Sequence, residues 1–153
     1  MVPYLARLAA DAGEMTLGVG LLAPLHNPVY TAETIATLDV ISRGNMIFGV
    51  GLGYRTAEFE AFSIRKGQRG QRFEECLAVA KRLWTEDRVS YESDTCILKD
   101  AHLSIKCVQK PHPPIWFAAR HANAIRGAAQ LARTLMIAAA NGRLGKRAVP
   151  KAA

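Results

Sequence analysis

The chain has 153 residues, half of them hydrophobic, which is enough for the core of one ordinary domain. It has no run of 18 apolar residues, and its N-terminus lacks a basic segment followed by an apolar one. The sequence therefore predicts neither a membrane span nor a signal peptide, and a cytoplasmic location. The net charge of +7 is unevenly distributed, because no acidic residue follows Asp100. The basic residues after Asp100 are scattered rather than clustered with aromatic side chains, which argues against a nucleic-acid partner.

Cysteine and histidine give no sign of a metal or disulfide framework. The three cysteines are odd in number and have no C-x-x-C spacing, so we expect reduced, semi-buried thiols. The four histidines also lack ligand spacing, and each is expected to be a surface or capping residue rather than a base. They are His26, His102, His112 and His121.

The first part of the chain alternates between helical and strand patterns. Residues 2–12 have the apolar spacing of the end of a helix, and residues 15–22 that of a strand. Asn27 and Pro28 predict the start of a second helix, because Asn accepts hydrogen bonds from free amides and Pro suits the first helical position. Gly44 is expected to end that helix.

The next segment, NMIFGVGLGYRTAEFEAF, is the most informative stretch of the sequence. Its apolar residues 47–52 predict a buried strand, and Gly49, Gly51 and Gly53 remove side chains where another backbone or a flat ligand must come close. A planar cofactor and a tightly packed strand without a ligand both fit this pattern. A Rossmann motif fits poorly, because the third glycine of G-x-G-x-x-G is absent.

The remaining pattern continues the alternation. Residues 56–62 predict a short helix, 71–84 an amphipathic helix, 89–108 a hairpin or irregular excursion, 115–118 a strand and 121–132 a helix. This order predicts an α/β protein with a parallel sheet. A basic cluster lies between the two central helices, and we interpret it as a solvated surface, with phosphate contact as the alternative. The cluster consists of Arg65, Lys66, Arg69 and Arg72.

Three segments together resemble the luciferase-like monooxygenase family, whose members are flavin- or deazaflavin-dependent oxidoreductases built on a TIM barrel. MTLGVGLLAPLHNPVYTAETIATLDVISRGNMIFGVGLGYRTAEFEAF is similar to the third strand, third helix and fourth strand of that family. RGQRFEECLAVAKRLWTED is similar to the helix before its hairpin, and the stretch from Lys106 to Trp116 is also typical. The resemblance covers about residues 3–131, and it implies a fragment of a TIM (β/α)8 barrel, roughly strands three to five with their helices and a hairpin insertion.

The resemblance implies a site at the C-terminal ends of the strands that binds FMN or the deazaflavin coenzyme F-420. Backbone and small side chains there would let a flat isoalloxazine ring lie close. The matching positions are Val19, Gly20 and Leu21 on one strand, Gly51, Leu52 and Gly53 on the next, and Ala118, Ala119 and Arg120 after the third. The family usually has Gly-Gly in this last loop, presenting amides to the cofactor phosphate, so here Arg120 is expected to pair with the phosphate by charge.

Tyr54 stands where sugar-phosphate dehydrogenases of the family carry glutamate, which argues against that activity. We expect Tyr54 to contact a small-molecule substrate, or to act as a lid or packing aromatic. No residue is assigned as a catalytic acid or base. The function implied is oxidation with reduced flavin and molecular oxygen, or hydride transfer with deazaflavin. The alternative is a truncated, non-catalytic remnant or a half-barrel association module.

A TIM barrel needs about 250 residues, so the resemblance implies an open sheet of about three strands with two unpaired edges. Such edges favour a homo-oligomer. Residues 132–153 are expected to be a basic tail of uncertain structure outside the barrel domain of residues 1–131. Their acid-free composition is of the kind that a frameshift produces.

Overall fold

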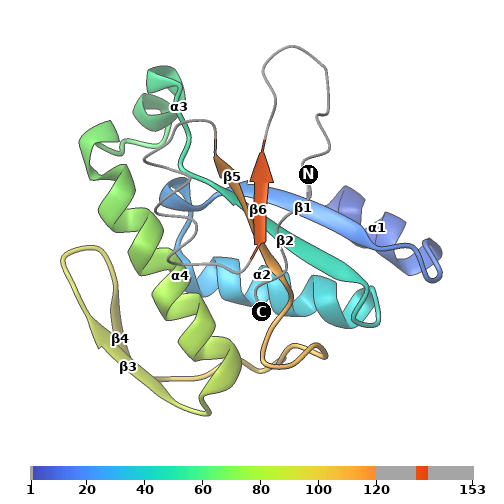
Figure 1. Cartoon of the computed structure of the whole chain (residues 1–153). Coiled ribbons are helices and arrows are strands. Elements are labelled where there is room, and N and C mark those ends of the chain that lie inside the picture. Colours follow the sequence, from blue (N-terminus) through green and yellow to red (C-terminus); the bar gives the residue numbers. More distant parts are fainter. Residues whose placement is uncertain (1, 120–133, 138–153) are drawn as a thin grey trace, which may run out of the picture.

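The computed structural model describes residues 2–119 and 134–137, and a four-stranded parallel sheet runs through its centre (Figure 1). The strands lie in the order β1-β2-β5-β6, and every neighbouring pair is parallel. Their bounds are Leu17–Leu22 for β1, Met46–Gly51 for β2, Ile115–Ala119 for β5 and Thr134–Ile137 for β6. The α/β prediction is therefore confirmed.

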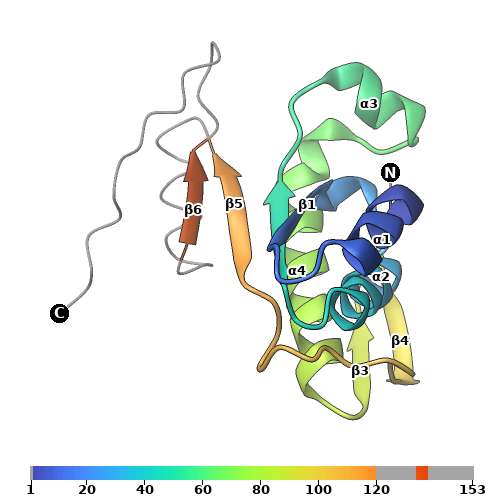
Figure 2. The same ribbon diagram turned by 90° about the vertical axis from the view of Figure 1, so that its right-hand side faces the viewer.

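The helices in the described part of the chain gather mainly on one side of this sheet. Figure 2 shows α1 (Val2–Asp11), α2 (Pro28–Ile41) and α4 (Arg69–Thr85) together beside β1 and β2. The short α3 (Thr56–Ala61) lies beyond the end of β2. Two single turns of 3-10 helix, η1 (Ala23–Leu25) and η2 (Lys66–Gln68), precede α2 and α4. Within the described ranges, no helix has the length and apolar character needed to cross a bilayer.

An antiparallel hairpin of β3 (Val89–Glu92) and β4 (Ile97–Ala101) follows α4, as one of the two predicted alternatives. The hairpin is tied to α4 through Glu75, a carboxylate only 8% exposed. Ser93 and Thr95, in the turn of the hairpin, each donate a side-chain hydrogen bond to one of its oxygens. The carboxylate thereby fixes the hairpin tip against the helix.

The core lies between the sheet and the helices. Phe48, at the centre of β2, is fully buried and meets Trp84 of α4 edge to face at 6.0 Å. The indole of Trp84 donates to the carbonyl of Ala32 at 2.9 Å, so its polar atom is satisfied. Phe73 and Phe117 form a second edge-to-face pair at 5.5 Å. These contacts join both long helices to the two central strands.

Local sequence signals account for the ends of α2. The side chain of Asn27 accepts a hydrogen bond from the amide of Val29 at 2.9 Å, and Pro28 takes the first helical position. Gly44 has a φ of 81° and its amide donates to the carbonyl of Asp39. The predicted start of this helix is confirmed. The helix itself ends at Ile41 with Ser42 as its C-cap, and Gly44 lies two residues further on, in the turn that caps it.

The prediction of about three strands is wrong by one. Residues 134–137 form β6, which pairs with β5, although they lie in the segment expected to be a tail of uncertain structure. The short run Thr-Leu-Met-Ile has strand propensity, but the basic composition around it masked that signal. The helix expected at residues 121–132 lies outside the described residues.

One buried carboxylate fixes the long connection from the hairpin to β5 through hydrogen bonds. Asp39 of α2 is fully buried, and its two carboxylate oxygens accept hydrogen bonds from the backbone amide of Gln109 at 2.9 Å and from the side-chain amide of Gln109 at 2.8 Å. The side-chain amide of Gln109 also donates to the carbonyl of Met46 at 2.9 Å. The connection is thus held against both α2 and the start of β2.

We expect Asp39→Ala to lower the free energy of unfolding by about 2–3 kcal/mol, because it leaves buried amide protons of Gln109 without an acceptor. Asp39→Asn should lie between this variant and the wild type, because it keeps one acceptor oxygen. Chemical denaturation is the measurement. Glu33→Ala on the exposed side of α2 is the control, with a change of less than about 0.5 kcal/mol, and equal effects in the two Ala variants would contradict the assignment.

The three cysteines are free, as predicted, and buried rather than semi-buried. Burial raises the pKa of Cys76 to about 11 and that of Cys107 to about 12. Burial also raises the pKa of Cys96. These thiols therefore stay protonated and weakly nucleophilic at neutral pH.

Native protein at pH 8 should accordingly react slowly with a disulfide reagent such as DTNB, because only about one Cys76 thiol in a thousand is ionised there. In denaturant all three thiols should react at the rate of a free cysteine. Rapid labelling of one thiol in the native state would show that it is accessible after all.

Candidate functional site

The carboxyl ends of the described strands β1, β2 and β5 meet at one edge of the sheet. Because the strands are parallel and in register, Leu22 pairs with Gly51, and Gly51 pairs with Ala118. We call this row the carboxyl edge. Open α/β sheets bind ligands at such an edge, since the loops that follow the strands converge there.

The two faces of the sheet differ in character. Side chains alternate along a strand, and those of Val19, Leu21, Phe48, Val50 and Phe117 are buried toward the helices. The other face, which we call the open face, carries small or apolar residues. It consists of Gly18, Gly20 and Leu22 of β1, Ile47, Gly49 and Gly51 of β2, and Trp116 and Ala118 of β5. The helices α1, α2 and α4 all lie on the opposite side (Figure 2).

This alternation divides the three positions predicted on β1. The side chains of Val19 and Leu21 are 3% and 8% exposed and point into the core, so only their backbone can face a ligand. Gly20 lies on the open face, paired with Gly49. Gly51 and Ala118 also lie on this face, at the carboxyl edge.

The glycines separate into those that the fold itself requires and those that it does not. A Cβ at Gly49 would lie 3.0 Å from the carbonyl oxygen of Val19, and one at Gly53 would lie 3.1 Å from the ring of Phe59. Gly53 also has a φ of 73°. A Cβ at Gly18 or Gly20 would meet no atom within 4 Å. Packing therefore explains Gly49 and Gly53, whereas the absence of a side chain at Gly20 leaves open space beside the carboxyl edge.

Tyr54 follows Gly53 beyond this edge and is 66% exposed, so it does not serve as a packing aromatic. Its hydroxyl accepts a hydrogen bond from Arg55 at 3.3 Å, and the guanidinium of Arg55 lies 5.6 Å from the ring centre. This hydrogen bond raises the pKa of Arg55. Leu52, beside Gly53, is half-buried. The side chains of Leu52 and Tyr54 could both reach a ligand bound at the carboxyl edge.

The third predicted position is described only in part. Ala118 is exposed on the open face and Ala119 ends β5, while Arg120 lies outside the described residues. Strand β5 therefore places the uncharged methyl group of Ala118 next to Gly51. The phosphate contact expected of Arg120 stays a prediction.

His26 follows β1 and η1 in the chain, and its lack of ligand spacing in the sequence gave no sign of a functional role. It comes directly after η1, at the end of β1, and its ring meets Phe62 edge to face at 6.3 Å. Half-burial lowers the pKa of His26, so its imidazole is neutral at physiological pH. The sequence feature that could have indicated a role for His26 is its position between the end of a strand and the start of a helix. Spacing relative to other metal-ligating residues could not have indicated it. His112, by contrast, packs against Trp84.

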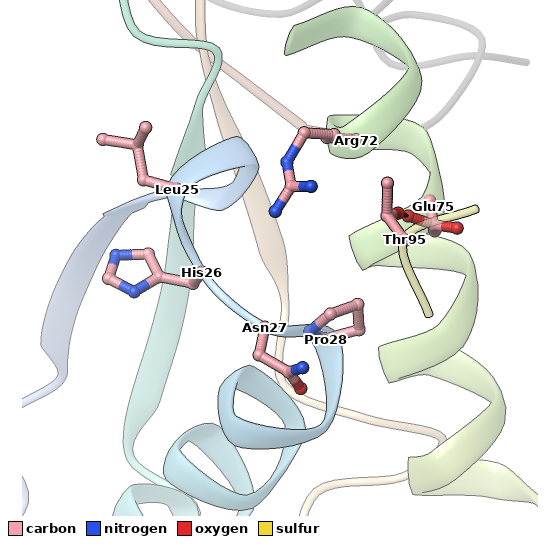
Figure 3. Close-up of a pocket in the computed structure, with 7 residues that line it drawn as sticks. All are labelled: Leu25, His26, Asn27, Pro28, Arg72, Glu75 and Thr95. Carbon is pink, nitrogen blue, oxygen red and sulfur yellow. Dashed lines mark hydrogen bonds between the residues drawn. The ribbon is translucent and has the colours of Figure 1, made fainter. Parts of the chain in front are cut away.

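A small cavity of about 90 Å³ lies on the helix side of the sheet, between η1, α4 and the hairpin (Figure 3). Arg72 extends into it and donates to the carbonyl of Pro24 at 2.9 Å. Thr95 is engaged by Glu75 on the other wall, and His26 points away from Arg72. Several polar groups around this cavity, those of Asn27, Arg72, Glu75 and Thr95, already make hydrogen bonds within the chain. Among the described residues, no group of His, Cys, Asp and Glu could hold a metal ion.

A parallel sheet with helices on one of its faces defines an α/β protein. The chain belongs to the luciferase-like monooxygenase family, whose sequence model matches residues 2–153.

Two curated relatives show the range of this family. The chain is 31% identical over 133 residues to the oxygenase component of a flavin-dependent trigonelline monooxygenase from Acinetobacter baylyi, a match covering 84% of this chain and 37% of the relative. It is 30% identical over 135 residues to an F420-dependent glucose-6-phosphate dehydrogenase from Microbacterium testaceum, covering 86% and 40%. The chain thus spans about two fifths of the length of these relatives.

A solved structure agrees in fold. The monooxygenase RslO1 from Streptomyces bottropensis superposes with a TM-score of 0.81 and 29% identity, over 89% of this chain and 42% of that one. The resemblance inferred from the three sequence segments is therefore confirmed at the level of the family.

Gly20 and Gly53 should respond differently when a methyl group is added. Gly53→Ala should lower the free energy of unfolding by about 1–3 kcal/mol, because it combines a positive φ with a contact against Phe59. Gly20→Ala should leave it unchanged or raise it by up to about 1 kcal/mol, because the strand accepts alanine and nothing is displaced. Chemical denaturation of both variants checks this, and a Gly20→Ala as unstable as Gly53→Ala would refute the division.

Proposed function

We propose that this chain carries the cofactor-facing part of an oxidoreductase of the luciferase-like monooxygenase type, acting on a small-molecule substrate. Family membership and the names of the relatives support it, since one is flavin-dependent and another F420-dependent. The observation that carries it in this chain is the open space over Gly20, on the same face as Gly51 and Ala118 at the carboxyl edge, which no packing contact explains.

The residues present fit a flat ring system such as that of FMN or coenzyme F-420. A side chain at Gly20 would occupy the space over the sheet that such a ring needs, and Ala118 adds only a methyl group to the same face. The residues proposed to hold the ring are Gly20, Gly51, Leu52, Gly53 and Ala118 with the backbone of Val19 and Leu21, and Ala119 and Arg120 are proposed to face the cofactor phosphate. When bound, such a cofactor supplies oxygen activation in its flavin form or hydride transfer in its deazaflavin form.

The residues of this chain would bind the cofactor, orient it and shield it from water. Leu22, Ile47 and Trp116 give the open face an apolar surface around the glycines, which favours exclusion of water from a bound ring. Tyr54 stands at the rim with an exposed ring and a hydroxyl, and is proposed to contact the substrate.

The four strands of the sheet are proposed to be consecutive strands of a (β/α)8 barrel, with the open face turned inward. Parallel pairing in chain order and helices on the opposite side support this arrangement. In the described sheet β1 and β6 each have a neighbour on one side only. We propose that other strands, from further barrel segments or from a second copy of the chain, pair with these edges.

The cofactor proposal is tested by titrating FMN, and then F-420, into the purified chain while following cofactor fluorescence, with the oligomeric state checked by size-exclusion chromatography. We expect saturable binding near one cofactor per chain or per dimer. Gly20→Val should weaken binding at least about tenfold, because the side chain fills the space that the ring needs.

Gly18→Val is the matched control, since Gly18 lies on the same open face with equally empty surroundings but about 7 Å further from the carboxyl edge. It should change affinity by less than about twofold. Equal losses in the two variants would place the ligand elsewhere, and no binding of either cofactor by a folded chain would refute the proposal.

A further inference from the structure

A second hollow lies beyond the carboxyl end of β2, between α3 and η2. It is an open groove of about 340 Å³, and Thr56 and Lys66 are among the residues that line it. Its apolar lining comes from Phe59, which is 1% exposed, and from half-buried Ile64. The segment 52–55 connects the groove directly to the carboxyl edge, and α3 lies on that side of the sheet in Figure 2.

Two cations, Arg65 and Lys66, line this groove. The ammonium of Lys66 donates to the hydroxyl of Thr56 at 3.0 Å, which leaves its other protons free for a ligand. In the part of the chain that the structure describes, neither Arg65 nor Lys66 takes part in an ion pair. Other arginines are neutralised, as Arg82 is by Glu86 at 2.8 Å. The positive charge at the groove is therefore available to an incoming group.

The structure also divides the basic cluster that the sequence presented as one unit. Arg72 is turned away to the carbonyl of Pro24, in the cavity of Figure 3. Arg65 and Lys66 both line the groove instead. One member of the cluster, Arg72, thus has a structural role, and two others, Arg65 and Lys66, face a hollow large enough for a substituent of a ligand.

Backbone strain marks the same place. Ser63 has a φ of 55° at the end of α3, where its amide donates to Glu60 and the amide of Ile64 donates to Phe59, each at 2.9 Å. This pattern ends helices and favours glycine, because other residues are strained in the left-handed region. The chain instead places a serine hydroxyl in the lining of the groove.

We propose that this groove binds an anionic group of the substrate, of the phosphate, sulfonate or carboxylate class, through Lys66, Arg65 and the hydroxyls of Thr56 and Ser63. Charge-assisted hydrogen bonds from an ammonium and a guanidinium suit such a group, and the hydroxyls add neutral donors. Assigning the anion to the substrate rests on the proposed function. Glu60, which also lines the groove, opposes the anion and so limits its affinity.

The experiment uses inorganic phosphate as the probe. Titration of the isotope-labelled full chain, followed by amide chemical shifts, should give saturable changes centred on residues 56–66 in the millimolar range. Lys66→Gln should weaken binding about tenfold, as for loss of one charge-assisted hydrogen bond. Lys99→Gln, which removes the same charge from exposed β4, should change it by less than about twofold.

Two further variants test the geometry and the sign of the charge. Thr56→Val removes the hydroxyl that orients Lys66 without removing charge, and should weaken phosphate binding about threefold. Glu60→Gln should strengthen it. Circular dichroism confirms that each variant is folded.

Shifts that rise linearly with phosphate, or equal losses in the two lysine variants, would overturn the groove as an anion site. The flavin titration is an independent readout. Phosphate binding in the groove without any cofactor binding would leave the anion site standing and refute the proposed function, whereas cofactor binding without saturable phosphate shifts would do the reverse.

Discussion

The arrangement of the sheet depends on a buried carboxylate that belongs to no strand. Asp39 accepts two hydrogen bonds from Gln109, which in turn reaches the carbonyl of Met46 at the first residue of β2. One charged group thereby ties together a helix, the start of a strand and the connection that leads to the next strand. A buried charge is tolerated only when hydrogen bonds surround it, and here they also determine where β5 begins beside β2.

The asymmetry of the sheet has a simple physical origin. On one face large side chains interlock with the helices, and on the other the sequence places glycine, alanine and a few flat apolar groups. Glycine weakens a strand, so its repeated use on one face needs a reason. The fold supplies that reason at Gly49 and Gly53, where an added methyl would collide with neighbours. At Gly18 and Gly20 it supplies none, so packing does not explain the glycines at these two positions.

Most of the secondary structure was predictable because its signals are local. The cap formed by Asn27 and Pro28, the glycine at position 44 and the apolar spacing of α4 each act within one or two turns of the chain. The strand at residues 134–137 was missed because four residues are too few for periodicity to stand out from a basic surrounding. The hydrogen bonds between Asp39 and Gln109 could not be predicted for another reason, because they join residues 70 positions apart in the sequence. Family resemblance located the candidate site, but only the alternation of faces could separate Gly20 from Val19 and Leu21.

The positions of the two tryptophans have an optical consequence. Trp84 is 2% exposed in the core beside Phe48, whereas Trp116 is partly exposed on the open face, in register with Gly49 and Gly20. The chain contains no other tryptophan. Its intrinsic emission is therefore the sum of one indole that reports on the integrity of the packed interior and one that reports on what lies over the sheet. Replacing either by phenylalanine would leave a chain whose ultraviolet fluorescence follows a single process, unfolding in one case and occupancy of the sheet surface in the other.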